Sequence, residues 1–519
     1  MLPLLASLAV LVPLAPPRLE DADSRVNFAH EQRQCHLRAC PYLHVSARPR
    51  AAAVLSSLAR SPNPPDDIPP RVADEASTTD LARFILPTLA GWLSSEVMSV
   101  VDTAVVGSSS AAELAALGPA TMLTDSGAYL FFWLNIATTN LFASNLAQGQ
   151  PEDAYDVLSD ALYVALACGL LLATALSLGG VPALSSICKH TPVLVPAANK
   201  YLSIRLLGMP AFIAGMVLQA ACLAAKDSTS PLVVLVVAGA LNLVLDLWLV
   251  NGMGLGIGGA AIATLFSQLV QVALLAVVVQ RKRAALGVRS GWALIGKPPP
   301  PKRLMTFLAF AGPIFLVLLG KISCYNAMTL AATSGGVVAL AAHQVMVSVF
   351  FFGCKFGDAV SQTAQAFLPS CMSDEATTAS RIGPRAQRLS RRLLKLSTLL
   401  GGFISLLAFG FITRCSRVFT TDLAVMQTIV SASPLLFVAL VAHATTMCSE
   451  GLLLGARQLQ YLARAYAFNV ALFLTGVYVV ARRAATLNMV WCALAIFQYV
   501  RLVQFLSRVR TLGMVRTTG

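Results

Sequence analysis

From about residue 81 onward, apolar residues form continuous blocks instead of alternating with polar ones. Each block is near or above the roughly 20 residues that an α-helix needs to cross a bilayer. Within hydrocarbon only helices and closed barrels satisfy every backbone hydrogen bond, and barrel strands alternate, so continuous blocks favour helices. The pattern predicts twelve spanning helices, near residues 82–106, 114–147, 157–179, 199–224, 231–251, 258–281, 304–332, 337–369, 392–412, 424–455, 459–481 and 487–507.

Composition supports a membrane protein and excludes several soluble classes. Hydrophobic residues make up 56% of the 519 residues and charged residues 12%, which leaves too little polar surface to cover several soluble domains. The net charge of +14 belongs to the hydrophobic body, where it indicates basic loops at a membrane surface and no nucleic-acid partner. Eleven scattered cysteines without a CxxC pair suggest neither a disulfide framework nor a zinc site.

The basic residues also predict the orientation of the chain. If the first helix starts on the non-translocated side, the even-numbered connections and the C-terminus hold about 19 Lys/Arg and the odd-numbered ones about 6. The positive-inside rule then places both chain ends on the non-translocated side.

The hydrophobic body contains an internal repeat. Pro87–Gly118 overlays Pro313–Gln344 at a constant offset of 226 residues, and Cys222–Lys226 overlays Leu452–Ala456 at nearly the same offset. Six crossings return the chain to its starting side, so the repeat predicts two six-helix lobes related by a pseudo-two-fold axis along the membrane normal. The alternative is chance similarity among Leu/Ala-rich helices. We therefore predict an all-α, polytopic membrane protein of twelve transmembrane helices in two lobes.

The predicted domain boundaries follow from these blocks. An N-lobe covers residues 79–290, a basic, Pro-rich linker 291–303, a C-lobe 304–510 and a short tail 511–519. Residues 1–78 differ in composition, and Ser24–Arg60 holds six Arg and one acid, as in an organelle transit peptide. Acids at Glu20, Asp21 and Asp23 weaken that interpretation. We expect a largely disordered targeting extension.

Polar groups inside the predicted spans of the first half suggest a cation site. A carboxylate near the middle of a span costs about 2.5–3.5 kcal/mol on insertion scales, so each one that remains there implies a function. Asp102 lies 15 residues after Pro87 in the first span, so that helix combines a titratable group with a hinge. Asn242 and Asp246 stand at i and i+4 on one helix face, and Thr264 follows in the sixth span. These oxygen ligands suit Na⁺ or H⁺ and not a soft transition metal.

Structural roles remain open for each of these residues. Asn242 and Asp246 could form a helix-packing hydrogen bond, and Asp102 could cap the end of its helix. The Thr264 hydroxyl could bond back to its own helix.

The second half carries polar residues of its own. Asp358, Gln362 and Gln365 recur at i, i+4 and i+7 in the eighth span, a stripe that we expect to face an aqueous cavity. The alternative is a self-neutralising ion pair between Asp358 and Lys355, three residues earlier.

Three further polar residues lie in these spans. Lys321 in the seventh span and Glu450 in the tenth either pair across helices or line a substrate path. His343 suits a hydrogen-bonded helix-end residue better than a proton relay.

Three sequence blocks resemble the multidrug and toxic compound extrusion (MATE) family. They are Val101–Gly107, Leu241–Asp246 and Gly258–Thr264, and the resemblance covers about residues 80–510. The first-helix Asp pattern is similar to that of the DinF-like branch, including its plant and algal plastid members. For this chain the resemblance implies a plastid envelope protein, although another cellular membrane remains open.

The family resemblance also implies residue roles. A cation-coupled efflux antiporter would use Asp102, Asn242, Asp246 and Thr264 as its coupling pocket, with Pro87 as the proline associated with helix bending. Met328 stands at the position that repeats Asp102, so coupling is expected in the N-lobe.

The expected function is a cation-coupled (H⁺ or Na⁺) antiporter that exports small amphipathic or aromatic organic molecules by alternating access. We expect a monomer without a cofactor, whose partners are a small organic substrate and the lipid bilayer. The alternative is a lipid or lipid-linked flippase, for which Lys321 and Arg205 could bind a phosphate head group. No HExxH, DDxxD or GxSxG motif occurs, which argues against an intramembrane enzyme.

Overall fold

The computed structural model describes residues 77–109, 111–189, 191–288, 298–333, 335–373, 382–420, 422–482 and 486–515. The regular structure of these residues is entirely helical. The expectations for residues 1–76 lie outside the described residues. The principal helices are α3 (Thr78–Ser109), α4 (Ala111–Tyr129), α5 (Phe132–Ala147), α6 (Pro151–Ile187), α7 (Val195–Leu207), α8 (Met209–Ala224), α9 (Thr229–Asp246), α10 (Ile257–Ala285), α11 (Pro301–Thr333), α12 (Gly336–Ser373), α13 (Pro384–Arg414), α14 (Leu423–Gly455), α15 (Leu459–Arg482) and α16 (Leu487–Thr511).

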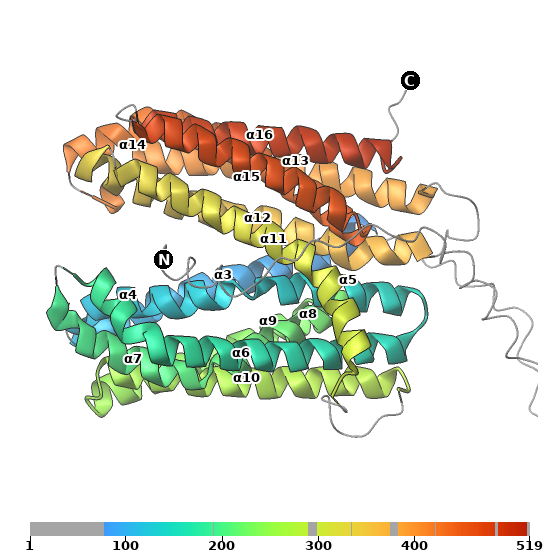
Figure 1. Ribbon diagram of the computed structural model, residues 1–519, viewed down its shortest axis with the longest axis horizontal. Coiled ribbons are helices and arrows are strands. Elements are labelled where there is room, and N and C mark those ends of the chain that lie inside the picture. The colour runs from blue at the N-terminus through green and yellow to red at the C-terminus, as the bar shows by residue number, and fades with distance from the viewer. Residues whose placement is uncertain are drawn as a thin grey trace, which may run out of the picture. The chain divides into compact units, whose positions relative to one another are not determined.

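Two groups of helices pack mainly among themselves, and Figure 1 shows them as two layers. We call α3–α10 the N-lobe and α11–α16 the C-lobe. In the N-lobe α8 packs on α5 and α6, and α9 packs on α3 and α10. In the C-lobe α14 is central, because it packs against α12, α13 and α16 and is buried continuously from Ala442 to Gly455. Gly451 permits the close approach of α12, since a Cβ there would lie 2.5 Å from the carbonyl oxygen of Ser361.

The spans agree with the predicted all-helical membrane fold. Within the described residues, 10 helices are long and apolar enough to cross a bilayer, or up to 11 if the bent pair formed by Pro192–Leu207 and Met209–Ala224 is one span. That pair bends by 53°. Pro210 explains the bend, because it has no N–H to continue the helical hydrogen bonds. Large apolar side chains such as Leu178 and Leu399 are exposed, as lipid-facing residues should be.

The second predicted span is also divided. Residues 114–147 were expected to form one helix, but α4 ends at Tyr129 and α5 begins at Phe132. Between them, the amides of Leu130 and Phe131 bond three residues back, to Gly127 and Ala128, which tightens the chain and ends the α-helical pattern. Neither α4 nor α5 alone is among the helices long and apolar enough to cross a bilayer.

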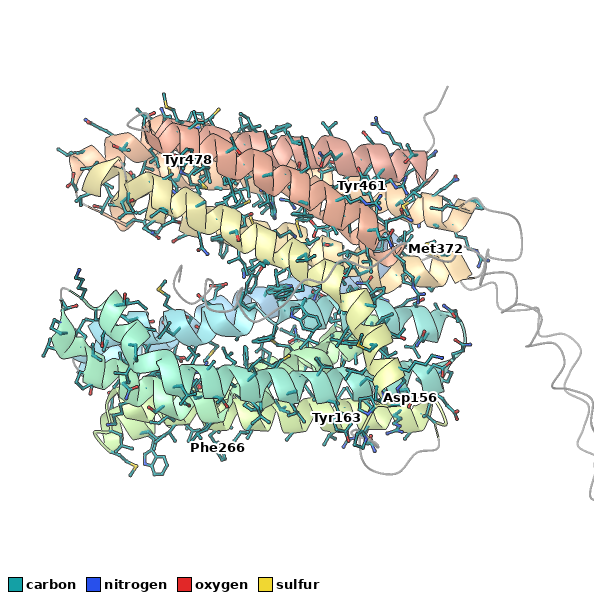
Figure 2. The ribbon with its side chains drawn as sticks, in the orientation of Figure 1. Asp156, Tyr163, Phe266, Met372, Tyr461 and Tyr478 are labelled. Atoms are coloured by element: carbon teal, nitrogen blue, oxygen red, sulfur yellow. The ribbon has the colours of Figure 1, made fainter. Side chains whose placement is uncertain are left out.

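The connection between the lobes ends earlier than predicted. The linker was expected to extend to residue 303, but α11 begins at Pro301. Arg303 forms ion pairs with Asp156 at 2.6 Å and Asp160 at 2.7 Å, both on α6. Figure 2 shows Asp156 beside the first turns of α11. The first turn of the C-lobe is therefore attached to the N-lobe by charge pairs.

Candidate cation-coupling site and polar networks

Three helices of the N-lobe bring Asp102, Asn242, Asp246 and Ser267 together. The Nδ2 amide of Asn242 on α9 donates to Asp102 Oδ1 on α3 at 2.8 Å and to Asp246 Oδ2 at 2.7 Å. Ser267 on α10 completes the group by donating its hydroxyl to Asn242 Oδ1 at 2.8 Å. One amide side chain thus joins two carboxyl groups that are 144 residues apart in the sequence.

The local structure explains why Asp246 lies inside the lobe. Its i, i+4 spacing from Asn242 places both side chains on the buried face of α9, where Asp246 is fully buried. A π-helical segment, Leu247–Gly252, follows directly and continues the same candidate span. Such segments are frequent at functional sites. Asp246 Oδ1 is buried without a hydrogen-bond partner among the described residues.

Thr264 does not bond to the two carboxyl groups. Its hydroxyl donates to the carbonyl oxygen of Ala260 at 2.9 Å, which is the bond within its own helix that the sequence left open. Ser267, three residues later, provides the hydroxyl that contacts Asn242. The sequence analysis missed Ser267, although its spacing from Thr264 places it on a neighbouring position of the same helix face.

Arg205 is a buried cation on α7 in the same lobe. Its Nη1 donates to Gln268 Oε1 at 2.8 Å, and its Nη2 lies 3.6 Å from Asp125 Oδ1. The Arg205 guanidinium therefore already has a hydrogen-bond partner and an ion-pair partner within the N-lobe.

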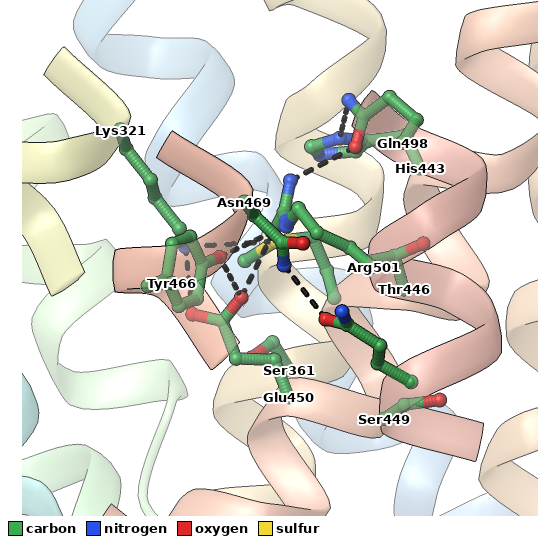
Figure 3. Close-up of polar contacts among 12 residues, drawn as sticks. Lys321, Ser361, His443, Thr446, Ser449, Glu450, Tyr466, Asn469, Gln498 and Arg501 are labelled. Carbon is green, nitrogen blue, oxygen red and sulfur yellow. Dashed lines mark hydrogen bonds and ion pairs between the residues drawn. The ribbon is translucent and has the colours of Figure 1, made fainter. Parts of the chain in front are cut away.

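The C-lobe contains a second polar network, centred on Glu450 of α14 (Figure 3). Lys321 Nζ of α11 lies 2.6 Å from Glu450 Oε1, and Arg501 Nη2 of α16 lies 3.0 Å from Oε2. Tyr466 of α15 also donates to Glu450 Oε2, at 2.6 Å. Two cations and a phenol thus surround one buried carboxylate.

The network continues into the C-lobe through Arg501. Its Nη1 donates to Gln498 Oε1 at 2.9 Å, and Gln498 Nε2 lies 3.1 Å from His443 Nδ1. Sequence analysis missed Arg501, Gln498 and Tyr466. Arg501 could have been noticed, because it is a charged residue inside the predicted span 487–507.

Lys321 and Glu450 also line a cavity between the lobes. The other lining side chains are apolar and come from both lobes, including Ile136 of α5 and Pro313 and Val317 of α11. The two residues therefore pair across helices, as one alternative from the sequence predicted, and they also face this cavity; their role in a substrate path stays a prediction.

The polar stripe of α12 lies mostly at the seam between the lobes. Gln362 accepts a hydrogen bond from Trp92 Nε1 of α3 at 3.3 Å, and Gln365 accepts one from Asn140 Nδ2 of α5 at 2.8 Å. Both glutamines are buried, with 7% and 4% exposure, so the expectation that they face an aqueous cavity is wrong for this conformation. Side chains of the N-lobe cover both glutamines, and the sequence of α12 does not show that such partners exist.

The neighbouring charges of α12 also differ from the expected pair. Lys355 forms an ion pair with Glu96 of α3 at 3.1 Å. Asp358 is half-buried. His343 is fully buried and lies 3.2 Å, through Nε2, from the Thr329 hydroxyl, so it is a hydrogen-bonded residue, although it lies inside α12 and not at a helix end.

The turn between α8 and α9 is fixed by Asp227. Its carboxylate accepts from the amides of Thr229 and Ser230 and pairs with Lys282 at 2.7 Å. Burial alone would raise the pKa of Asp227, but the hydrogen bonds from Lys282 and Ser230 outweigh it and hold the pKa below its ordinary value. The turn is thus anchored by a charged carboxylate.

Spanning helices in two groups, with polar side chains buried inside each group and along the seam between them, define the class of two-lobed membrane transporters. Comparison with known proteins identifies the family within that class. A family model described as MatE matches residues 87–248. "Protein DETOXIFICATION 47, chloroplastic" of Arabidopsis thaliana is 32% identical over 435 residues, which cover 84% of this chain and 78% of the relative. This chain belongs to the MATE family.

More distant relatives agree with this assignment. "DNA damage-inducible protein F" of Escherichia coli is 27% identical over 292 residues, covering 56% of this chain and 63% of that protein. The structure of the Vibrio cholerae MATE transporter VcmN in the bent form is similar in fold, with a TM-score of 0.72 and 20% identity over 84% of this chain and 98% of that one.

Family membership makes this protein a multi-span membrane transporter of the multidrug and toxic compound efflux type, and not an enzyme. Several relatives are named as chloroplastic, which supports the expected location in the plastid envelope.

Proposed function

We propose that this protein is a cation-coupled antiporter that exports small organic molecules by alternating access, with Asp102, Asn242 and Asp246 as its coupling site. The observation that carries the proposal is the single Asn242 amide joined to two carboxyl groups inside the N-lobe. A carboxyl group that is charged when it holds a cation and neutral when it does not can bias a two-state protein toward one arrangement.

The orientation of Asn242 favours the proton as the coupling ion. Its NH₂ group, and not its carbonyl oxygen, faces both carboxyl groups, and the carbonyl accepts from Ser267. A sodium ion requires oxygen ligands, and the Asn242 carbonyl could join Asp246 Oδ1 as a ligand only after the amide had turned over. Two carboxyl groups that share one amide can hold a single proton without any such change.

The lining of the inter-lobe cavity favours an amphipathic or aromatic substrate, although its volume of about 20 Å³ means that the lobes would have to separate before such a molecule could enter. Its lining is apolar except for Lys321 and Glu450. Aromatic rings also lie along the seam: Trp92 and Phe132 have centroids 5.8 Å apart, and Tyr129 stacks on Phe132 at 5.6 Å. Such surfaces suit ring systems with few polar groups. The flippase alternative lacks support, because both cations that it would use, Lys321 and Arg205, already have partners.

The test of the proposal is transport by the full-length protein in proteoliposomes. A fluorescent aromatic cation serves as the probe, first under a pH gradient alone and then under a Na⁺ gradient at equal pH. We expect the pH gradient to drive uptake and the Na⁺ gradient to have no effect. Transport driven by Na⁺ alone would reassign the ion, and a labelled phospholipid that moves while the cation does not would support the flippase.

Pro87 provides a test of the conformational step. It lies within α3, which is continuous from Thr78 to Ser109, and its missing N–H makes this a point where the helix can bend. We expect Pro87→Ala to slow turnover several-fold with little change in the proton concentration that gives half-maximal transport. Initial rates over a pH series measure both quantities. Pro182→Ala is the matched control, because Pro182 lies in α6 and is exposed; a wild-type rate in Pro87→Ala would argue against the hinge.

A further inference from the structure

Two helices in different lobes end with the same kind of turn around a residue that is not glycine. After α8, the amide of Lys226 bonds to Leu223 O at 2.9 Å and that of Asp227 to Cys222 O at 3.0 Å. After α14, the amide of Arg457 bonds to Leu454 O at 2.9 Å and that of Gln458 to Leu453 O at 2.9 Å. Both pairs form a Schellman motif. The motifs place Cys222 and Leu453 at equivalent positions. The repeat in the sequence had instead aligned Cys222 with Leu452, so the structural alignment differs from it by one residue.

Both turns place a long basic side chain where glycine is usual. The φ angle is +60° at Lys226 and +56° at Arg457, and these are the non-glycine residues with positive φ among the described residues. Side chains of L-residues rarely adopt this conformation, and the corresponding position of a Schellman motif is usually Gly. Such outliers persist where the surrounding structure stabilises them, and they cluster at functional sites.

Each of these side chains reaches across to the other lobe. Lys226 Nζ donates to the Ser370 hydroxyl of α12 at 2.9 Å, and Arg457 Nη2 donates to the Ser144 hydroxyl of α5 at 2.7 Å. Ser144 and Ser370 are separated by the offset of 226 residues that relates the two lobes. The two lobes therefore make equivalent contacts with each other. In each, a basic side chain from the turn at the end of one helix bonds to a serine near the end of a helix in the other lobe.

The two contacts lie at one end of the seam. Ser144 and Ser370 are in the last turns of α5 and α12, and both helices lead into even-numbered connections. Figure 2 shows Asp156, near the start of α6, and Met372, near the end of α12, at the same end of the molecule. By the positive-inside rule this end is the non-translocated side.

Further inter-lobe bonds follow this pair along α12. The bonds of Gln365 to Asn140 and of Gln362 to Trp92 come next along the seam. The Lys226 and Arg457 contacts are therefore the outermost of the inter-lobe bonds along α5 and α12, and the Arg303 ion pairs with α6 lie at the same end of the molecule.

We propose that Lys226 and Arg457 form a reciprocal clamp that holds the lobes together on the non-translocated side and opens as one unit when the transporter changes orientation. This inference rests on the proposed alternating access. Because the two contacts are related by the repeat, both span the same gap, and separation of the lobes breaks both. The left-handed turns fix the direction of each side chain, so the clamp closes without reorganisation of the backbone.

The clamp is tested by hydrogen exchange of the full-length protein in nanodiscs, which requires no transport. Glycine is the informative substitution, since it suits the turn and removes only the side chain. We expect Lys226→Gly combined with Arg457→Gly to accelerate amide exchange roughly tenfold or more at the ends of both α5 and α12, as expected for the loss of two hydrogen bonds with charged donors. Lys226→Arg with Arg457→Lys keeps both donors and should exchange like the wild type.

Single substitutions test the reciprocity. Either glycine variant alone should accelerate exchange at both helix ends, because the lobes separate as a unit. Acceleration only at the end that loses its partner, or unchanged exchange in the double variant, would overturn the clamp. Ser144→Ala with Ser370→Ala removes the acceptors without altering the turns, so it gives the same test if the glycine variants do not fold. Failure of the coupling site would appear in gradient-driven transport and not in these exchange rates.

Discussion

Substitution of Asp246 by Asn is expected to reduce gradient-driven transport to the level of protein-free liposomes while the protein stays folded. Asn has nearly the same shape, and its carbonyl oxygen can still accept the hydrogen bond that Asn242 Nδ2 gives to Asp246 Oδ2. What the substitution removes is the group that can bind and release a cation. Asp102 then remains as a single carboxyl group, so the two-group arrangement no longer exists.

The measurement is uptake of the fluorescent aromatic cation under a pH gradient, together with substrate counterflow without a gradient. We expect Asp246→Asn to retain counterflow, since substrate movement between equal solutions needs no coupling ion, and to keep a wild-type thermal midpoint. Asp153→Asn is the control, because Asp153 is an exposed carboxylate in the first turn of α6. Undiminished gradient-driven uptake in Asp246→Asn would rule out this residue as a coupling group.

The N-lobe site could be approached from sequence because part of its geometry is local. Asn242 and Asp246 lie one helical turn apart, so their spacing alone places them on one face. The contact with Asp102, by contrast, joins two helices 140 residues apart. No spacing rule reaches that far: polarity inside a predicted span made Asp102 a candidate ligand, and only the family resemblance implied that it shares a pocket with Asn242 and Asp246. Ser267 was missed for a related reason, since nothing in α10 shows which of its hydroxyl groups faces Asn242.

The contacts between lobes were beyond the reach of sequence patterns. The α12 stripe was recognised as polar, but polarity does not distinguish a side chain facing water from one hydrogen-bonded to another lobe. Gln362 and Gln365 are of the second kind, with partners 270 and 225 residues away. The division of residues 114–147 into two helices was missed because hydropathy depends only on residue type. It does not show where a backbone amide bonds to the carbonyl three residues earlier instead of four.

The second large effect is expected in the C-lobe, where Glu450→Gln should strongly destabilise the protein. Glu450 compensates both Lys321 and Arg501, and its side chain is 3% exposed. Removal of its charge leaves two cations close together in a largely buried region. Loss of one partner from a buried ion pair typically costs about 3–5 kcal/mol. We expect the thermal midpoint in detergent to fall by about 10 °C.

Lys321→Met is the informative comparison, because it leaves Glu450 paired with Arg501 and hydrogen-bonded to Tyr466. It should lower the thermal midpoint by less than a third of the Glu450→Gln effect. The double variant should be more stable than Glu450→Gln alone, since one uncompensated cation then remains instead of two. Thermal unfolding followed by tryptophan fluorescence measures all three variants. A Glu450→Gln protein as stable as Lys321→Met would mean that the carboxylate does not neutralise both cations, and the network would then have to be held together by Tyr466 and Gln498 instead.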